Sequence, residues 1–253
     1  MTQTPERLSF REGVAALKSA QKPSRGTAAY SRLVNRPLGR LCAALGNSFG
    51  MTPNQATAVS ATLSGSAIVL IFVVRPQIWL GILVAVLLAG GYVMDSVDGQ
   101  LARLRGGGTK QGEWLDHTVD TFKTSLVHLA VLVSWYRFPP AESAWWLAVP
   151  LAFEVVAMVT YFGFMLMPTL RPASLAPVAA SETLVTENPL RKYALLPIDY
   201  GMHCWMFVLL GWGTGFLTVY TAVFVCCAAA LLLGLRKWWI ELGETDALLA
   251  RNA

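Results

Sequence analysis

Charged residues are scarce in this chain. Only 14% of its 253 residues are Asp, Glu, Lys or Arg, whereas 55% are hydrophobic. That balance excludes an ordinary soluble domain and favours a protein that crosses the membrane several times. The net charge of +5 comes without a basic run interleaved with aromatic residues, so nucleic acid is not an expected partner.

Thiols and imidazoles are also few. The four cysteines include an adjacent pair and no CxxC spacing, which excludes a zinc knuckle and argues against a disulfide framework. The three histidines, His117, His128 and His203, share no spacing and have no acidic partner that would form a catalytic triad. Each histidine is therefore interpreted as structural.

Long hydrophobic runs, in contrast, are abundant. Six are long enough to cross about 30 Å of hydrocarbon. They cover residues 56–74, 78–94, 114–135, 145–167, 195–212 and 214–235. The sequence therefore predicts an all-α membrane protein with six transmembrane helices.

Basic residues set the expected orientation. Most lie before the first run, in the connections 101–111 and 170–194, or after the last run, and only Arg75 and Arg137 fall on the opposite side. By the positive-inside rule, both termini and the two longer connections face the cytoplasm. A polar cavity at that end would open to the cytoplasm.

The N-terminal segment has an amphipathic pattern of its own. In residues 30–45, leucines alternate with arginines, as in a helix that lies in the membrane interface, although Pro37 interrupts the pattern. We expect three regions: a cytoplasmic N-terminal segment with this interfacial helix (1–50), a six-helix transmembrane catalytic domain (51–240) and a cytoplasmic tail (241–253).

Four aspartates lie where the second predicted span ends and the third begins: Asp95, Asp98, Asp116 and Asp120. Residues three or four apart share a helix face, so each pair forms a stripe, and the short connection makes the two helices neighbours. Carboxylates at membrane depth need compensation. Oxygen ligands suit Mg²⁺ or Mn²⁺, and four carboxylates balance two such ions, which can clamp the oxygens of a phosphate displacement.

Small and basic residues surround these aspartates. Gly99, Ala102 and Gly112 are small where a nucleotide would approach the helix backbone closely. Arg103 suits a diphosphate because its planar guanidinium binds oxyanions. The glycines at 106–108 are interpreted either as a flexible turn or as part of a ligand loop, and they lack the P-loop pattern.

Four further ionisable residues have two readings each. Lys123, three residues after Asp120, either forms a salt bridge with the site or extends toward lipid headgroups. Arg191 and Lys192 either bind the phosphate of an acceptor or supply ordinary positive-inside charge. Glu154, within the fourth span, has no clear role and could face the substrate cavity.

The pattern D-x2-D-G-x2-A-R-x8-G-x3-D-x3-D resembles, at every fixed position, the signature of the CDP-alcohol phosphotransferase family of integral membrane enzymes. The resemblance implies that Asp95, Asp98 and Asp116 hold metal, and that Asp120 completes the site and acts as general base. It also implies a homodimer, and a reaction that moves a phosphoalcohol from a CDP-alcohol donor to an alcohol acceptor in phospholipid synthesis and releases CMP.

Two other segments resemble donor-binding elements of this family. Residues 52–57, Thr-Pro-Asn-Gln-Ala-Thr, look like the element near the cytidine, and the GGGT sequence at 106–109 is similar to the loop of bacterial phosphatidylinositol phosphate synthases. The expected CDP-alcohol-binding residues are Asn54, Thr57, Gly99, Ala102, Arg103, Thr109 and Gly112. The expected acceptor-binding residues are Lys123, Arg191 and Lys192.

Three functions remain open at this point. CDP-diacylglycerol could donate a phosphatidyl group to an acceptor of the inositol phosphate or glycerol phosphate type. Alternatively, a soluble CDP-inositol, CDP-glycerol or CDP-choline could donate to a lipid or polyol, because residues 35–37 and 52–54 also resemble archaeal inositol-phosphodiester synthases. An ion-coupled transporter is a third reading, but it gives no reason for the Gly, Ala and Arg positions. We expect a multi-pass protein of a bacterial or archaeal cell membrane, with two Mg²⁺ ions, or Mn²⁺, on its cytoplasmic side.

Overall fold

The computed structural model describes residues 8–19, 28–170 and 191–252, and within these ranges it contains helices and connections but no strand. The all-α prediction is therefore confirmed for the described residues. The helices are α1 (Phe10–Ser19), η1 (Ser31–Asn35), α2 (Arg36–Ser48), α3 (Pro53–Val73), α4 (Ile78–Leu104), α5 (Lys110–Arg137), η2 (Trp145–Leu147), α6 (Ala148–Leu170), α8 (Arg191–Ala194), η4 (Leu196–Ile198), α9 (Tyr200–Met206), η5 (Phe207–Leu209) and α10 (Gly213–Asn252).

Four of the described helices are long and apolar enough to cross a membrane: α3, α4, α6 together with η2, and α10. The third predicted run forms α5, which is 28 residues long but carries charged residues in its first half. The fifth run is not one helix. Pro197 lies in the 3₁₀ turn η4, and Asp199 Oδ1 accepts a hydrogen bond from the Gly201 backbone N–H (2.9 Å) and so begins α9. The fifth run was predicted as one helix because its residues are mostly apolar, although Pro197 and Asp199 each interrupt a helix.

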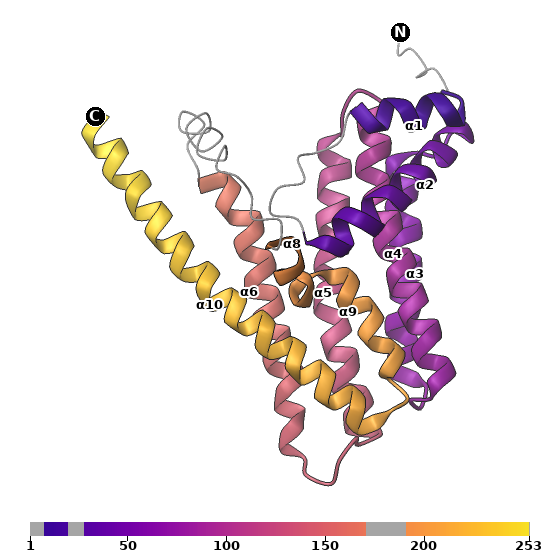
Figure 1. Cartoon of the computed structure of the whole chain (residues 1–253), viewed down its shortest axis with the longest axis vertical. Coiled ribbons are helices and arrows are strands. Elements are labelled where there is room, and N and C mark those ends of the chain that lie inside the picture. Colours follow the sequence, from indigo (N-terminus) through magenta and orange to yellow (C-terminus); the bar gives the residue numbers. More distant parts are fainter. Residues whose placement is uncertain (1–7, 20–27, 171–190, 253) are drawn as a thin grey trace.

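The helices alternate in direction along the chain. In Figure 1, α3, α5 and α9 run one way, and α4, α6 and α10 run the other. The connection between α4 and α5 therefore lies at the same end as the N-terminal helices α1 and α2. The aspartates belong to that half of α4 and α5, where α2 packs against α4.

Helix α3 packs along both α4 and α5 and is the element that holds them together. The main core between the helices is apolar, with Ile71, Leu80, Val131 and Tyr220 fully buried. One close approach requires glycine: a Cβ on Gly81 would lie 2.6 Å from the Phe207 carbonyl oxygen. This contact packs η5 directly against α4.

The predicted amphipathic segment at 30–45 is helical but changes type at its proline. Residues Ser31–Asn35 form a π-helical turn, and Pro37 lies at the start of α2. Proline has no N–H to donate and its ring crowds the preceding turn, which explains the change of hydrogen-bond register there. Three large side chains one turn apart on α2 are exposed: Leu38, Leu41 and Leu45.

Candidate active site

The turn between α4 and α5 is built by glycine. Gly106 and Gly107 have φ of 82° and 137°, which L side chains rarely adopt, and the Gly107 N–H donates to the Ala102 carbonyl (2.9 Å). This arrangement satisfies a carbonyl at the end of α4 and stops the helix. These glycines therefore form a turn, and their part in a ligand loop stays a prediction.

Thr109 begins the next helix. Its hydroxyl oxygen accepts a hydrogen bond from the Gly112 N–H (3.0 Å), as an N-cap does. The same stretch is tied to the start of α3: a Cβ on Gly112 would lie 3.1 Å from Asn54 Oδ1. Two of the predicted donor-binding residues, Asn54 and Gly112, are thus brought together, and Gly112 is small partly because Asn54 lies against it.

Arg105 fixes this end of α4 to the N-terminal helices. One of its guanidinium nitrogens donates to the carbonyl oxygens of Gly50 (3.2 Å) and Met51 (2.6 Å). The next residues begin α3 with a capping box, in which Thr52 Oγ1 accepts from Gln55 N–H and the Gln55 side chain accepts from Thr52 N–H. The start of α3 is therefore anchored beside the aspartates.

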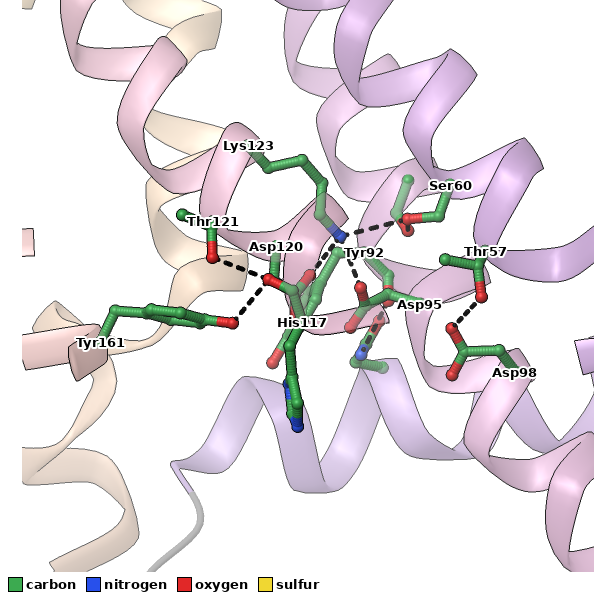
Figure 2. Close-up of polar contacts among 12 residues, drawn as sticks. Thr57, Ser60, Tyr92, Asp95, Asp98, His117, Asp120, Thr121, Lys123 and Tyr161 are labelled. Carbon is green, nitrogen blue, oxygen red and sulfur yellow. Dashed lines mark hydrogen bonds and ion pairs between the residues drawn. The ribbon is translucent and has the colours of Figure 1, made fainter. Parts of the chain in front are cut away.

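Asp95 and Asp120 share one positive charge (Figure 2). Lys123 Nζ lies 2.5 Å from Asp95 Oδ1 and 2.6 Å from Asp120 Oδ1, and it donates a longer hydrogen bond to Ser60 Oγ (3.3 Å). The residue is only 8% exposed. Of the two readings of Lys123, the salt bridge with the site is the one that the structure contains.

Asp98 has a different partner. Thr57, on α3, donates its hydroxyl hydrogen bond to Asp98 Oδ2 (2.9 Å), and both residues are buried (Figure 2). Through this hydrogen bond, Thr57 orients the carboxylate of Asp98. Such orienting groups hold metal ligands in place in many sites.

Asp116 and His117 complete the cluster. Asp116, His117 and Asp120 each offer one ligand atom, and these atoms lie within 4.8 Å of one another. Asp116 Oδ1 and His117 Nδ1 are both buried without a hydrogen-bond partner among the described residues. Buried oxygens are rarely left unpaired, so the cluster fits a divalent cation, for which carboxylate oxygens are the preferred ligands.

His117 was interpreted as structural from the sequence, and its backbone does have a structural contact. Tyr161, on α6, and Thr121 both donate hydrogen bonds to the His117 carbonyl oxygen, at 2.9 and 2.7 Å. Its ring, however, belongs to the candidate metal group. The signal that could have found it is its position between two aspartates of the motif.

Gly99, Ala102 and Arg103 lie on the last turns of α4. A Cβ on Gly99 would meet only the end of the Arg103 side chain, at 3.7 Å, so packing within the described chain does not require glycine there. Arg103 Nε is buried without a hydrogen-bond partner among the described residues. Both observations agree with a surface that receives a ligand.

The expected acceptor residues are not gathered in one place by the contacts that are described. Lys123 is within the aspartate cluster. Lys192 Nζ lies 4.9 Å from the centre of the Tyr193 ring, a cation–π distance. Arg191 is described only as the first residue of α8, and its side chain lies outside the described part.

A cavity of about 640 Å³ lies between α5, α6, α9 and α10. Its lining is mostly apolar and includes Phe153 and Leu231, while Tyr92 and Tyr161 line it and stand beside the aspartates (Figure 2). Sequence analysis missed this cavity because residues from several helices, including α4, form it. The polar cytoplasm-facing cavity expected from the sequence stays a prediction.

Two known proteins are similar to this chain. Phosphatidylinositol phosphate synthase of Corynebacterium glutamicum is 36% identical over 112 residues, which cover 43% of this chain and about half (49%) of that relative. The crystal structure of Mycobacterium tuberculosis phosphatidylinositol phosphate synthase, PgsA1, in complex with manganese and citrate aligns with a TM-score of 0.49 and 21% identity over 81% of this chain and 89% of that one.

The family model described as CDP-alcohol phosphatidyltransferase matches residues 50–233. That segment is well over half of the chain and contains all four aspartates, α3, α4 and α5. With four helices long and apolar enough to cross a membrane, the chain is an integral membrane protein, and it belongs to the CDP-alcohol phosphatidyltransferase family.

Proposed function

We propose that this protein is a CDP-alcohol phosphotransferase of phospholipid synthesis, which transfers a phosphoalcohol to the hydroxyl of an acceptor and releases CMP. The observation that carries the proposal is the candidate metal group of Asp116, His117 and Asp120, in which a buried Asp116 oxygen has no hydrogen-bond partner among the described residues. Asp95 is joined to this group because it shares the Lys123 ammonium with Asp120. Family membership supports the same reaction.

The metal site would be formed by Asp95, Asp98, Asp116 and Asp120. Divalent cations, two Mg²⁺ ions or Mn²⁺, would neutralise the diphosphate of the donor and stabilise the charge that develops on the CMP leaving group. Thr57 holds one oxygen of Asp98, and Lys123 holds one oxygen each of Asp95 and Asp120. These contacts would keep the carboxylates oriented toward the donor before it binds.

Asp120 would be the general base. Its carboxylate takes the proton of the acceptor hydroxyl, the acceptor oxygen forms a bond to the phosphorus distal to cytidine, and the bond from that phosphorus to the CMP oxygen breaks. A carboxylate among cations is a weak base, so position matters more than basicity. Tyr161 and Thr121 hold the His117 carbonyl on the turn before Asp120 and so stabilise that position.

The donor would lie against the start of α3 and the end of α4. Asn54 and Thr109 would face the cytidine, Arg103 the diphosphate, and the small Gly99 and Ala102 would allow close approach. Asn54 and Gly112 already lie side by side, and a Cβ on Gly108 would be in ordinary contact with the Ala102 side chain (3.9 Å). These positions support one donor site that spans the turn between α4 and α5.

A lipid substrate is favoured by the apolar cavity beside the aspartates. Its volume of about 640 Å³ and its mostly apolar lining suit hydrocarbon better than a polyol. We therefore propose CDP-diacylglycerol as donor and a small phosphorylated alcohol, of the inositol phosphate or glycerol phosphate type, as acceptor. Arg191 and Lys192 are the proposed acceptor residues, whereas the Lys123 ammonium is already paired with Asp95 and Asp120.

The proposed membrane arrangement has six passages, with α5 and the α8 to η5 segment as the third and fifth. The alternating directions of the helices support it (Figure 1). The exposed leucines of α2 would lie in the cytoplasmic interface, with residues 1–50 and 241–253 in the cytoplasm, 51–240 as the catalytic domain, and a polar cavity open to that side. We further propose a homodimer in a bacterial or archaeal cell membrane.

The direct test is a matrix of donors and acceptors. Membranes that contain the protein and Mg²⁺ or Mn²⁺ are expected to release CMP from CDP-diacylglycerol only when a suitable alcohol is added, and mass spectrometry would identify the new lipid. Membranes without the protein are the control. Formation of product from a soluble CDP-headgroup and a lipid would reverse the donor assignment. If no pair of donor and acceptor releases CMP, the proposed enzymatic activity is wrong.

Gly99 gives a sharper test of the donor site. Gly99→Ala is expected to raise the KM for the CDP-alcohol roughly tenfold or more, because an extra methyl in a packed contact costs about 1–3 kcal/mol. The matched control is Gly65→Ala on α3, where an added Cβ meets nothing within 4 Å. Both replacements favour a helix by up to about 1 kcal/mol, so stability should not fall. An unchanged KM in Gly99→Ala would remove this residue from the donor site.

A further inference from the structure

Among the basic residues that the structure describes, Lys123 is unusual because its ammonium is buried between carboxylates. The residue is 8% exposed, and Nζ contacts Asp95 Oδ1, Asp120 Oδ1 and Ser60 Oγ. An ammonium has three N–H donors, and these three contacts use all of them. The ammonium therefore has no N–H left for another acceptor.

Ser60 fixes the direction of the third contact. Its own hydroxyl donates to the Gly91 carbonyl oxygen on α4 (2.8 Å), so the oxygen of Ser60 accepts from Lys123. Ser60 is fully buried on α3. The ammonium is thus anchored to a group that is not a carboxylate, and it can keep this contact when Asp95 or Asp120 turns to another partner.

The positive charge of Lys123 affects both the stability of the aspartate cluster and its affinity for cations. When the four aspartates are ionised, as metal ligands must be, they carry four negative charges, and the Lys123 ammonium neutralises one of them. Removing one partner of a buried ion pair leaves an uncompensated charge, which strongly destabilises a folded protein. A divalent cation that binds Asp95 or Asp120 meets the same ammonium a few ångströms away and is repelled by it.

We propose that Lys123 is a built-in counter-ion of the metal site, which keeps the aspartates assembled without metal and weakens the binding of divalent cations there. The inference rests on the metal site of the proposed function. It makes the negative diphosphate of the donor an aid to full cation occupancy. Lys123 is on this view a positioning residue.

The test compares Lys123→Met with wild-type protein, both full-length in detergent. Thermal unfolding is followed in EDTA and at increasing Mn²⁺, and Mn²⁺ binding is read directly from the electron paramagnetic resonance signal of the free ion. In EDTA the variant should unfold at a lower temperature. Its Mn²⁺ midpoint should fall roughly tenfold or more, because a positive charge that repels the cation is removed, and saturating Mn²⁺ should restore most of the lost stability.

The matched control is Lys110→Met, because Lys110 lies on the same helix but forms an exposed pair with Glu113. It should leave both the EDTA unfolding temperature and the Mn²⁺ midpoint at their wild-type values. Equal midpoints in Lys123→Met and wild type would overturn the inference while leaving the metal site intact. No Mn²⁺ response in wild type would overturn the metal site itself and the inference with it.

Folding failure is also informative. If Lys123→Met cannot be purified in EDTA, Lys123→Met and Lys123→Gln are both prepared with Mn²⁺ throughout. Recovery of folded protein only with Mn²⁺ supports a counter-ion that metal can replace. Failure of both variants even with Mn²⁺ would show that the ammonium is needed for packing irrespective of metal, and would overturn the proposal.

Discussion

Asp120→Asn is expected to lower kcat by about 10²–10⁴-fold, the usual contribution of a general base. The amide has nearly the same shape as the carboxylate but cannot take the proton of the acceptor hydroxyl. Three carboxylates remain for metal, so the CDP-alcohol should still bind with a dissociation constant close to that of wild type. Turnover is measured as CMP release, and binding is measured separately with the labelled donor.

The control for this change is Glu113→Gln on the same helix. Glu113 pairs with Lys110 at the surface, at a Nζ to Oε2 distance of 2.8 Å, so its loss should leave turnover within about twofold of wild type, as expected for an exposed ion pair. Normal turnover in Asp120→Asn would remove the general-base assignment. Loss of donor binding together with turnover would instead make Asp120 chiefly a metal ligand.

Asp98→Asn is expected to lower both Mn²⁺ affinity and turnover by more than about 100-fold. Residues that only orient a metal ligand typically contribute roughly 10- to 100-fold. Asp98 is buried, and the Thr57 hydroxyl holds its carboxylate in one orientation. We therefore expect that no neighbouring side chain can take its place as a metal ligand. Mn²⁺ binding and thermal stabilisation by Mn²⁺ are the direct readouts, and CMP release is the functional one.

Thr57→Val provides the graded comparison for Asp98. It keeps the carboxylate and removes only the hydrogen bond that orients it, so the loss of Mn²⁺ affinity should fall within about 10- to 100-fold. Thr57→Ser, which keeps the hydroxyl, should resemble wild type. Full Mn²⁺ stabilisation of Asp98→Asn would exclude this residue from the metal site.

The aspartate stripes are the feature that sequence reasoning predicted best. Spacings of three and four residues place side chains on one helix face whatever surrounds the helix, and each pair of aspartates does lie on one helix, α4 or α5. The glycines at 106–108 had two interpretations from sequence, and the structure shows that they form a turn. The helix break in residues 195–212 was missed, because hydrophobic composition outweighed Pro197 and Asp199, which interrupt a helix at single positions.

The partners of each aspartate could not be predicted from sequence. Thr57 and Ser60 lie one turn apart on α3, and nothing in their spacing to Asp98 or Lys123 shows that they meet them. The two readings of Lys123 stayed equal for the same reason. His117 was set aside because its relation to Asp116 and Asp120 depends on side-chain geometry rather than on a recognised spacing.

The sequence by itself determined the family-type motif, the all-α class and the carboxylate faces that point to phosphotransfer chemistry, because these depend on residue types and on the repeat of a helix. Only the tertiary structure decided which charge compensates which carboxylate, because that depends on how α3 packs along both α4 and α5. It also decided that an apolar cavity lies beside the aspartates, since side chains from several helices must meet to form it.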